Sequence, residues 1–178
     1  GYTLVLIDCF SRWLELFPVD SATGESSAFC LLQHFGRFGA PSQIRSDRGP
    51  HFVNSIIREF LTMIGTEHCL TLAYSKEENA LVERANKEVN RHLRAFTFDT
   101  NTVDNWRTSL PMVQRIMNAT FSDRTKLSSA TILFGNAINL DRGIFAPPSE
   151  VSRDAQPLSD YMINLLAVQD NIITIARN

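Results

Sequence analysis

Two acidic side chains in this sequence are placed so that together they could hold a divalent metal ion. Asp47 stands in the stretch IRSDRGPHF, residues 44–52, directly after a short apolar run, and Glu83 follows after a gap of 35 residues. Taken singly, Asp47 is a typical turn residue and Glu83 a typical solvated helix glutamate. If the end of a strand met the start of a helix, however, the two carboxylates would suit Mg²⁺. That arrangement predicts metal-dependent phosphodiester chemistry.

Positive charge gathers on the helical segment that carries Glu83. Residues 84–94 contain four Arg or Lys and one Glu, a local charge of +3 in a chain of net charge −2. Steps of three or four residues along a helix place several polar and basic side chains on or beside the face of Glu83. These residues are Arg84, Lys87, Asn90, Arg91 and Arg94. They could contact a DNA backbone, although a solvated basic face explains the charge alone equally well.

Alternating strands and helices are expected to position these residues. Residues 2–8 and 13–19 read as a β-hairpin, because both are rich in β-branched and aromatic residues or alternate apolar with polar ones. A helix is predicted over 23–41, ending at Gly39 and Pro41. Further apolar patterns predict a strand over 42–46, a helix over 52–65 and a strand over 67–73. The expected order is therefore β, β, α, β, α, β.

The rest of the chain is predicted to be mainly helical. A helix over 75–96 would open with a capping box of Ser75 and Glu78, and a second over 103–121 contains Pro111, which marks either a kink or a new first turn. A short helical turn is expected at 129–135 and a Pro/Ser-rich linker at 143–157. The amphipathic stretch 158–178 lacks a stop signal, so the chain is expected to continue beyond it.

Composition narrows the class of protein. The chain has 178 residues, 44% of them hydrophobic and 20% charged, which suits one globular domain. The sequence has neither an apolar run long enough to span a bilayer nor the pattern of a signal peptide, so we expect an intracellular, soluble protein without membrane partners. The odd set of Cys9, Cys30 and Cys69 is expected to be buried free thiols rather than disulfides or a zinc site.

Four blocks of sequence resemble the integrase catalytic core of long-terminal-repeat retrotransposons of the Ty3/gypsy type, which are related to retroviral integrases. The blocks are YTLVLIDCFSRWLELFPV, IRSDRGPHF, NALVERANKEV and LPMVQRIMNATF…LSSATILFGNAINLDRGIF, and they follow one another in the family's order over residues 1–150. The resemblance implies an α/β, RNase H-like fold, in which helices flank a mixed five-stranded sheet. It also implies DNA integration through Mg²⁺- or Mn²⁺-dependent transfer of DNA 3′-ends to target DNA.

The resemblance assigns roles to particular residues. Asp47 would be the second aspartate and Glu83 the glutamate of an Asp, Asp, Glu metal triad, and Asn86 and Lys87 would contact the DNA of the element ends. It further implies a homo-oligomer that binds element and target DNA, and a nuclear location for the intact parent protein. Residues 1–150 would form the core domain, and 151–178 a linker and a C-terminal helix.

The sequence departs from the family pattern at its start. The first catalytic aspartate of the family lies on a strand that precedes Gly1, so the first strand is expected to be missing and the 178 residues to be inactive alone. Asp8 is expected to cap the turn before Ser11 and Arg12, with a backup ligand role left open. Two alternatives to a strand transferase remain: a catalytically dead module that binds DNA or protein, and an RNase H-type nuclease.

Overall fold

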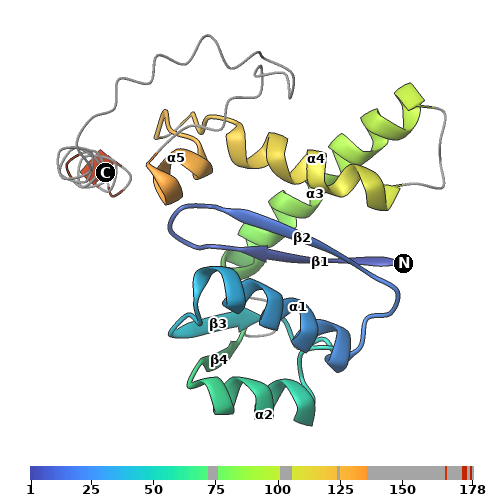
Figure 1. Ribbon diagram of the computed structural model, residues 1–178, viewed down its shortest axis with the longest axis vertical. Coiled ribbons are helices and arrows are strands. Elements are labelled where there is room, and N and C mark those ends of the chain that lie inside the picture. Colours follow the sequence, from blue (N-terminus) through green and yellow to red (C-terminus); the bar gives the residue numbers. More distant parts are fainter. Residues whose placement is uncertain are drawn as a thin grey trace, which may run out of the picture. The chain divides into compact units, whose positions relative to one another are not determined.

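A computed structural model describes residues 1–71, 76–100, 106–123 and 125–135, together with four positions between 167 and 177 (Figure 1). Contacts within the chain divide it into two compact units. The first comprises Gly1–Leu6 and Leu16–Leu110, and the second comprises Ile7–Glu15 and Pro111–Asn178.

The described strands form two small sheets. Strands β1 (Tyr2–Ile7) and β2 (Leu14–Val19) pair with each other, which confirms the predicted hairpin. Strands β3 (Gln43–Ser46) and β4 (Glu67–Leu70) pair in parallel, with Ser46 opposite Leu70. Within the described residues no ladder joins the two pairs, so the four strands do not form the single mixed sheet that the resemblance implies. The proposed upstream strand stays a prediction.

Helices α1 (Gly24–Phe38) and α2 (Ser55–Ile64) begin and end at residues that satisfy their terminal backbone groups. Thr23 caps α1 through a hydrogen bond from the Ser26 amide to its side chain. Gly65 ends α2 with φ of 77°, a left-handed conformation that favours glycine. The order β, β, α, β, α, β is confirmed; α2 begins later than predicted, after the cap at Asn54.

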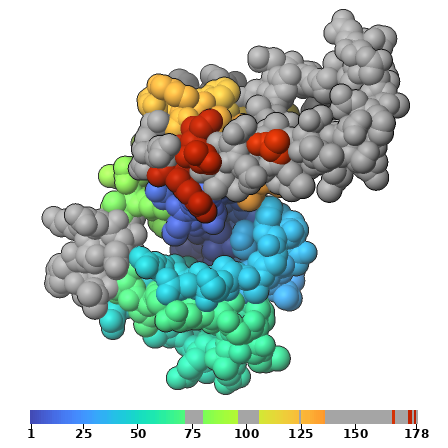
Figure 2. Space-filling model, turned by 90° about the vertical axis from the view of Figure 1, so that its left-hand side faces the viewer, coloured from blue at the N-terminus to red at the C-terminus, as the bar shows by residue number. Residues whose placement is uncertain are grey.

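Two apolar clusters form the core of the first unit. One contains Leu31 and Phe35 of α1 with Ile57 and Leu61 of α2, and Ile44 of β3 packs against it. The other contains Leu4, Phe17 and Cys30, joined by Phe52 from the segment after β3. The surfaces of α1 and α2 accordingly adjoin in the space-filling view (Figure 2). Phe52 thus anchors the segment after Asp47 to the core.

Not every apolar residue of the predicted helix faces is buried. Phe29 is 61% exposed and Leu32 53% exposed, whereas Leu31 and Phe35 are buried. The cysteines also differ from expectation. All three are free, but Cys9 is exposed and Cys69 only partly buried, while burial raises the pKa of the Cys30 thiol.

Three further helices follow: α3 (Lys76–Thr100), α4 (Trp106–Ala119) and α5 (Ser129–Phe134). They confirm the predicted helices, and Pro111 lies inside α4 rather than at a new helix start. The proposed cap Ser75 and the linker 143–157 lie outside the described residues, as does most of 158–178. Among the described residues, the helices are too short or too polar to cross a bilayer.

Candidate active site

Asp47 lies at the carboxyl end of β3, where the sequence predicts it. Its side chain is exposed and turns back to accept a hydrogen bond from the Gly49 amide at 2.8 Å. This bond fixes one carboxylate oxygen, Oδ1, and is the bond expected of a turn aspartate. Within the described residues it is the carboxylate's one hydrogen bond, so the second oxygen is available to a ligand.

The backbone before Asp47 is held by its neighbour in the parallel pair of strands. The Ser46 hydroxyl donates to the Asp47 carbonyl at 2.9 Å and lies 2.9 Å from Nε2 of His68 on β4. Since the hydroxyl has one hydrogen, His68 Nε2–H donates to Ser46 Oγ. Burial lowers the pKa of His68, which favours this neutral form.

The turn after Asp47 is fastened at two further points. Arg48 Nε donates to the Thr71 carbonyl at 3.3 Å, next to the end of β4. Asn54 caps α2 by accepting from the Ile57 amide at 3.0 Å, and its amide nitrogen donates to the Pro50 carbonyl at 3.0 Å. The turn is therefore tied to both elements that follow it, which keeps Asp47 at a defined position.

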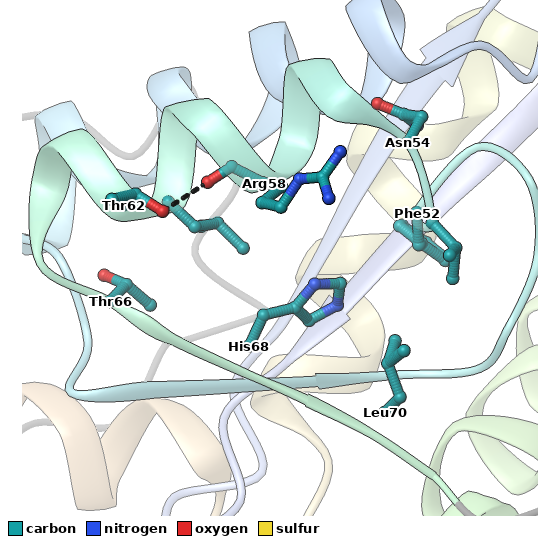
Figure 3. A pocket seen from close by; sticks show the side chains of 9 residues that line it. Phe52, Asn54, Arg58, Thr62, Thr66, His68 and Leu70 are labelled. Atoms are coloured by element: carbon teal, nitrogen blue, oxygen red, sulfur yellow. Dashed lines mark hydrogen bonds between the residues drawn. The ribbon is translucent and has the colours of Figure 1, made fainter.

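A cavity of about 380 Å³ opens beside this turn, between α2 and β4 (Figure 3). Arg58 of α2 and His68 of β4 both border it. Its other lining residues are Phe52, Val53, Asn54, Leu61, Thr62, Thr66 and Leu70. None of the lining residues is acidic, so the cavity has a positive and partly apolar wall.

The residues predicted to bind DNA are all exposed on α3. Glu83 is exposed as well, whereas Ala85 and Val89 are buried. The helix α3 therefore has one apolar, buried face and one polar, exposed face, as its sequence predicts. The exposed set is Arg84, Asn86, Lys87, Asn90, Arg91 and Arg94. These residues share a surface of α3; that this surface binds DNA stays a prediction.

Charge on this surface is partly neutralised. Arg91 forms an ion pair with Glu88 at 2.7 Å, and its Nε donates to the same carboxylate at 2.8 Å. Arg84 Nε donates to the Ala80 carbonyl of its own helix. Lys87 has neither a hydrogen bond nor an ion pair within the described residues and so offers a full positive charge.

Asp8 has the structural role that the sequence predicts. Its Oδ2 accepts hydrogen bonds from the Ser11 amide at 2.6 Å, the Ser11 hydroxyl at 2.7 Å and the Phe10 amide at 3.2 Å. Arg12 follows with φ of 65°, and its amide closes the turn onto the Asp8 carbonyl. This oxygen of Asp8 is thus fully engaged in shaping the hairpin turn.

The donor set partly fits a divalent metal ion. Asp47 offers one carboxylate oxygen that makes no hydrogen bond within the described residues, whereas a Cβ at position 49 would lie 2.9 Å from the bonded oxygen, Oδ1, and would crowd it. The described residues do not, however, contain a group of three or more His, Cys, Asp or Glu side chains able to hold a metal. Convergence of Glu83 with Asp47 stays a prediction.

Sequence reasoning missed three residues that shape this site: His51, Asn54 and His68. Asn54 carried a signal, because an asparagine directly before an apolar helical run is a typical N-cap. His51 and His68 had no such signal, since their positions beside Gly49 and Ser46 depend on the folded turn and on strand pairing.

Part of the chain matches a model of a known protein family. Residues 1–76 match the model described as "Integrase core domain". The chain is 32% identical over 176 residues to the Pol polyprotein of Feline endogenous virus ECE1, covering 97% of this chain and 16% of that protein. It is 35% identical over 113 residues to the Gag-Pol polyprotein of Feline leukemia virus, covering 63% of this chain and 6% of that protein. The chain thus spans a small part of these relatives.

Solved structures of integrase cores share the fold. The trimeric form of the HTLV-2 integrase catalytic core domain in complex with magnesium is 20% identical with a TM-score of 0.62, covering 71% of this chain and 80% of that one. The catalytic core domain of BIV integrase is 21% identical with a TM-score of 0.61, covering 72% and 82%. The fold is therefore the mixed α/β, RNase H-like fold of integrase cores.

Proposed function

We propose that this chain, in which residues 1–76 are an integrase core domain, is the catalytic core of an enzyme that joins DNA 3′-ends to target DNA. The observation that carries the proposal is the turn at Asp47, which presents a free carboxylate oxygen at the carboxyl end of β3. The matched relatives are retroviral Pol polyproteins, so a retroviral origin is favoured and a Ty3/gypsy origin is the alternative.

Asp47 and Glu83 are the residues that would hold a Mg²⁺ or Mn²⁺ ion. Such an ion would activate the attacking oxygen and stabilise the leaving oxygen of a phosphodiester transfer. The chain's own contribution is to orient Asp47 through Gly49 and Ser46 and to place DNA against the exposed residues of α3, Lys87 above all. A further carboxylate is needed for the family triad, and we propose that it precedes Gly1.

The test is metal-dependent joining of labelled oligonucleotides to a target duplex. We expect the 178-residue chain alone to be inactive and a longer product of the same reading frame to be active. In the longer protein, Asp47→Asn and Glu83→Gln should each abolish joining, whereas Glu59→Gln, which removes an exposed acid from α2, should not. Full activity in Asp47→Asn would refute the proposal.

A second candidate is a catalytically silent module that binds DNA or protein. It is favoured by the exposed basic side chains of α3 and by Phe29 and Leu32, which are exposed on α1. Both candidate functions include the proposals that the protein forms a homo-oligomer and binds DNA. Both also keep residues 1–150 as the proposed core, and residues 151–178 as the proposed linker and C-terminal helix. DNA binding without metal, combined with an inactive longer protein, would favour this candidate.

A further inference from the structure

The cavity between α2 and β4 has one positively charged side chain on a wall that is otherwise neutral. Arg58 of α2 and His68 of β4 border this space of about 380 Å³, and their side chains point towards one another from its two walls (Figure 3). The volume lies in the range of small-molecule sites in proteins, roughly 300–1,000 Å³. Such sites combine apolar walls with a few polar groups that fix the orientation of a ligand. The side chains of this wall therefore indicate which kind of molecule would fit.

The guanidinium of Arg58 is available to an anion. The side chain is exposed, and within the described residues it makes neither a hydrogen bond nor an ion pair. Glu59 and Glu67, the acids next to Arg58 and His68 in the sequence, do not line the cavity. The side chain of Glu67 points to the opposite face of its strand from that of His68, and it accepts a hydrogen bond from Gln43 at 3.0 Å. An anion in the cavity would therefore meet an uncompensated positive charge.

The histidine and the two threonines of the wall already donate their hydrogens within the protein. His68 Nε2–H donates to Ser46 Oγ at 2.9 Å, which leaves Nδ1 as a neutral acceptor. The hydroxyls of Thr62 and Thr66 donate to backbone carbonyls at 2.7 Å and 2.9 Å. Arg58 is thus the one charged group among the lining residues. A ligand with a single negative charge would match it.

The rest of the wall is mainly apolar and can accommodate a hydrocarbon group. Its apolar side chains are those of Phe52, Val53, Leu61 and Leu70. Leu61 belongs to the buried cluster between α1 and α2, and Phe52 packs on the second cluster, so both side chains are held in place by the core. Burial of apolar ligand surface against them would favour binding by about 25 cal/mol per Å². A small anion without a hydrocarbon group would not gain this contribution.

We propose that this cavity binds a small organic carboxylate, whose negative charge pairs with Arg58 and whose apolar group lies against Phe52, Leu61 and Leu70. The guanidinium carries a planar fork of N–H donors that matches the two oxygens of a carboxylate. A phosphate monoester would bring close to two negative charges, and the lining residues offer no second cation to pair with them. The proposed site needs neither a metal ion nor DNA, so its failure and the failure of the proposed function are distinguishable.

Titration of the purified chain with benzoate, followed by two-dimensional NMR, tests the proposal. We expect benzoate to shift the signals of the lining residues, Thr62, His68 and Leu70 among them. Acetate has the charge without the ring, and benzamide has the ring without the charge, so each should bind at least about fivefold more weakly than benzoate. An absence of shifts, shifts confined to residues outside the cavity, or an affinity for benzoate no higher than for acetate or benzamide would overturn the proposal. Tighter binding of phenyl phosphate than of benzoate would overturn the assignment of a singly charged ligand.

Two arginine variants test the role of the charge. Arg58→Gln removes the exposed charge but keeps a polar side chain, and it should weaken benzoate binding by about fivefold, the upper end for an exposed ion pair. The same variant should bind benzamide as the wild type does. Arg45→Gln is the matched control, because Arg45 is an exposed arginine of β3 that donates to Gln43 and does not line the cavity, and it should keep the wild-type affinity for benzoate. Equal affinities of Arg58→Gln and the wild type for benzoate would overturn the proposal.

Discussion

The side-chain amide of Asn118 makes two hydrogen bonds with the backbone of Leu14, a residue 104 positions earlier in the chain. Asn118 Oδ1 accepts from the Leu14 amide at 2.8 Å, and Nδ2 donates to the Leu14 carbonyl at 2.8 Å. Both residues are buried. The amide thus satisfies backbone groups at the start of β2 in the way that a neighbouring strand would, and it joins α4 to the hairpin within the second unit.

Replacing Asn118 should therefore destabilise the protein strongly. Asn118→Ala leaves a buried N–H and a buried C=O of Leu14 without partners, which predicts a loss of roughly 2–4 kcal/mol in the free energy of unfolding. Urea denaturation followed by circular dichroism measures it. Thr120→Ala, which removes an exposed hydroxyl that donates to the Ile116 carbonyl of the preceding helix, is the matched control and should cost less than about 0.5 kcal/mol. Equal losses in the two variants would contradict this role of Asn118.

This contact also shows where prediction from sequence ends. The hairpin and the helices were predictable because alternation, helical spacing and glycines such as Gly39 and Gly65 are local signals. Nothing local links Asn118 to Leu14, since the partner of a buried amide depends on the whole fold. For the same reason, the spacing of Phe29 and Leu32 showed that they share a helix with Leu31 but not that they remain exposed.

The features of the candidate site also divide into those that local sequence signals predict and those that depend on the whole fold. The position of Asp47 at a strand end and the exposure of the basic residues of α3 could be read from the sequence. The fastening of the turn by His68 through Ser46 could not, because it requires the parallel register that sets Ile44 beside His68. Convergence with Glu83 depends on contacts between elements far apart in the sequence, which periodicity does not encode.

Asn54 should stabilise the folded protein through two hydrogen bonds whose contributions can be measured separately. Asn54→Ala removes the cap of α2 and the bond to the Pro50 carbonyl, so a loss of about 1–2 kcal/mol in the free energy of unfolding is expected. Asn54→Asp retains the capping oxygen but not the donor to Pro50, and should cost less. Thermal and urea denaturation of both variants check this order, and an Asp variant less stable than the Ala variant would contradict it.

Burial of His68 makes stability depend on pH. Because burial lowers its folded-state pKa below the usual 6.5, the unfolded chain binds a proton more readily than the folded protein does. The contribution of His68 is fully present above pH 6.5 and is lost as the pH falls through its lowered folded pKa. The free energy of unfolding, measured by urea denaturation from pH 7.5 to 5, should decline more steeply in the wild type than in His68→Gln.

Glutamine can still donate to Ser46 but cannot gain a proton in this range, so it isolates the titration of His68. Parallel curves for the wild type and His68→Gln would contradict the prediction.

DNA binding by α3 should respond oppositely to two neighbouring substitutions. Lys87 offers an unpaired charge, so Lys87→Ala should weaken binding to a duplex of any sequence and reduce the slope of log affinity against log salt by about 0.9, the value for one phosphate contact. Glu88→Gln should instead strengthen binding, because it releases Arg91 from its ion pair and removes a negative charge from the same face. Fluorescence anisotropy with a labelled duplex across a salt series measures both. A Lys87→Ala slope equal to that of the wild type, or weaker binding by Glu88→Gln, would place the DNA elsewhere on the protein.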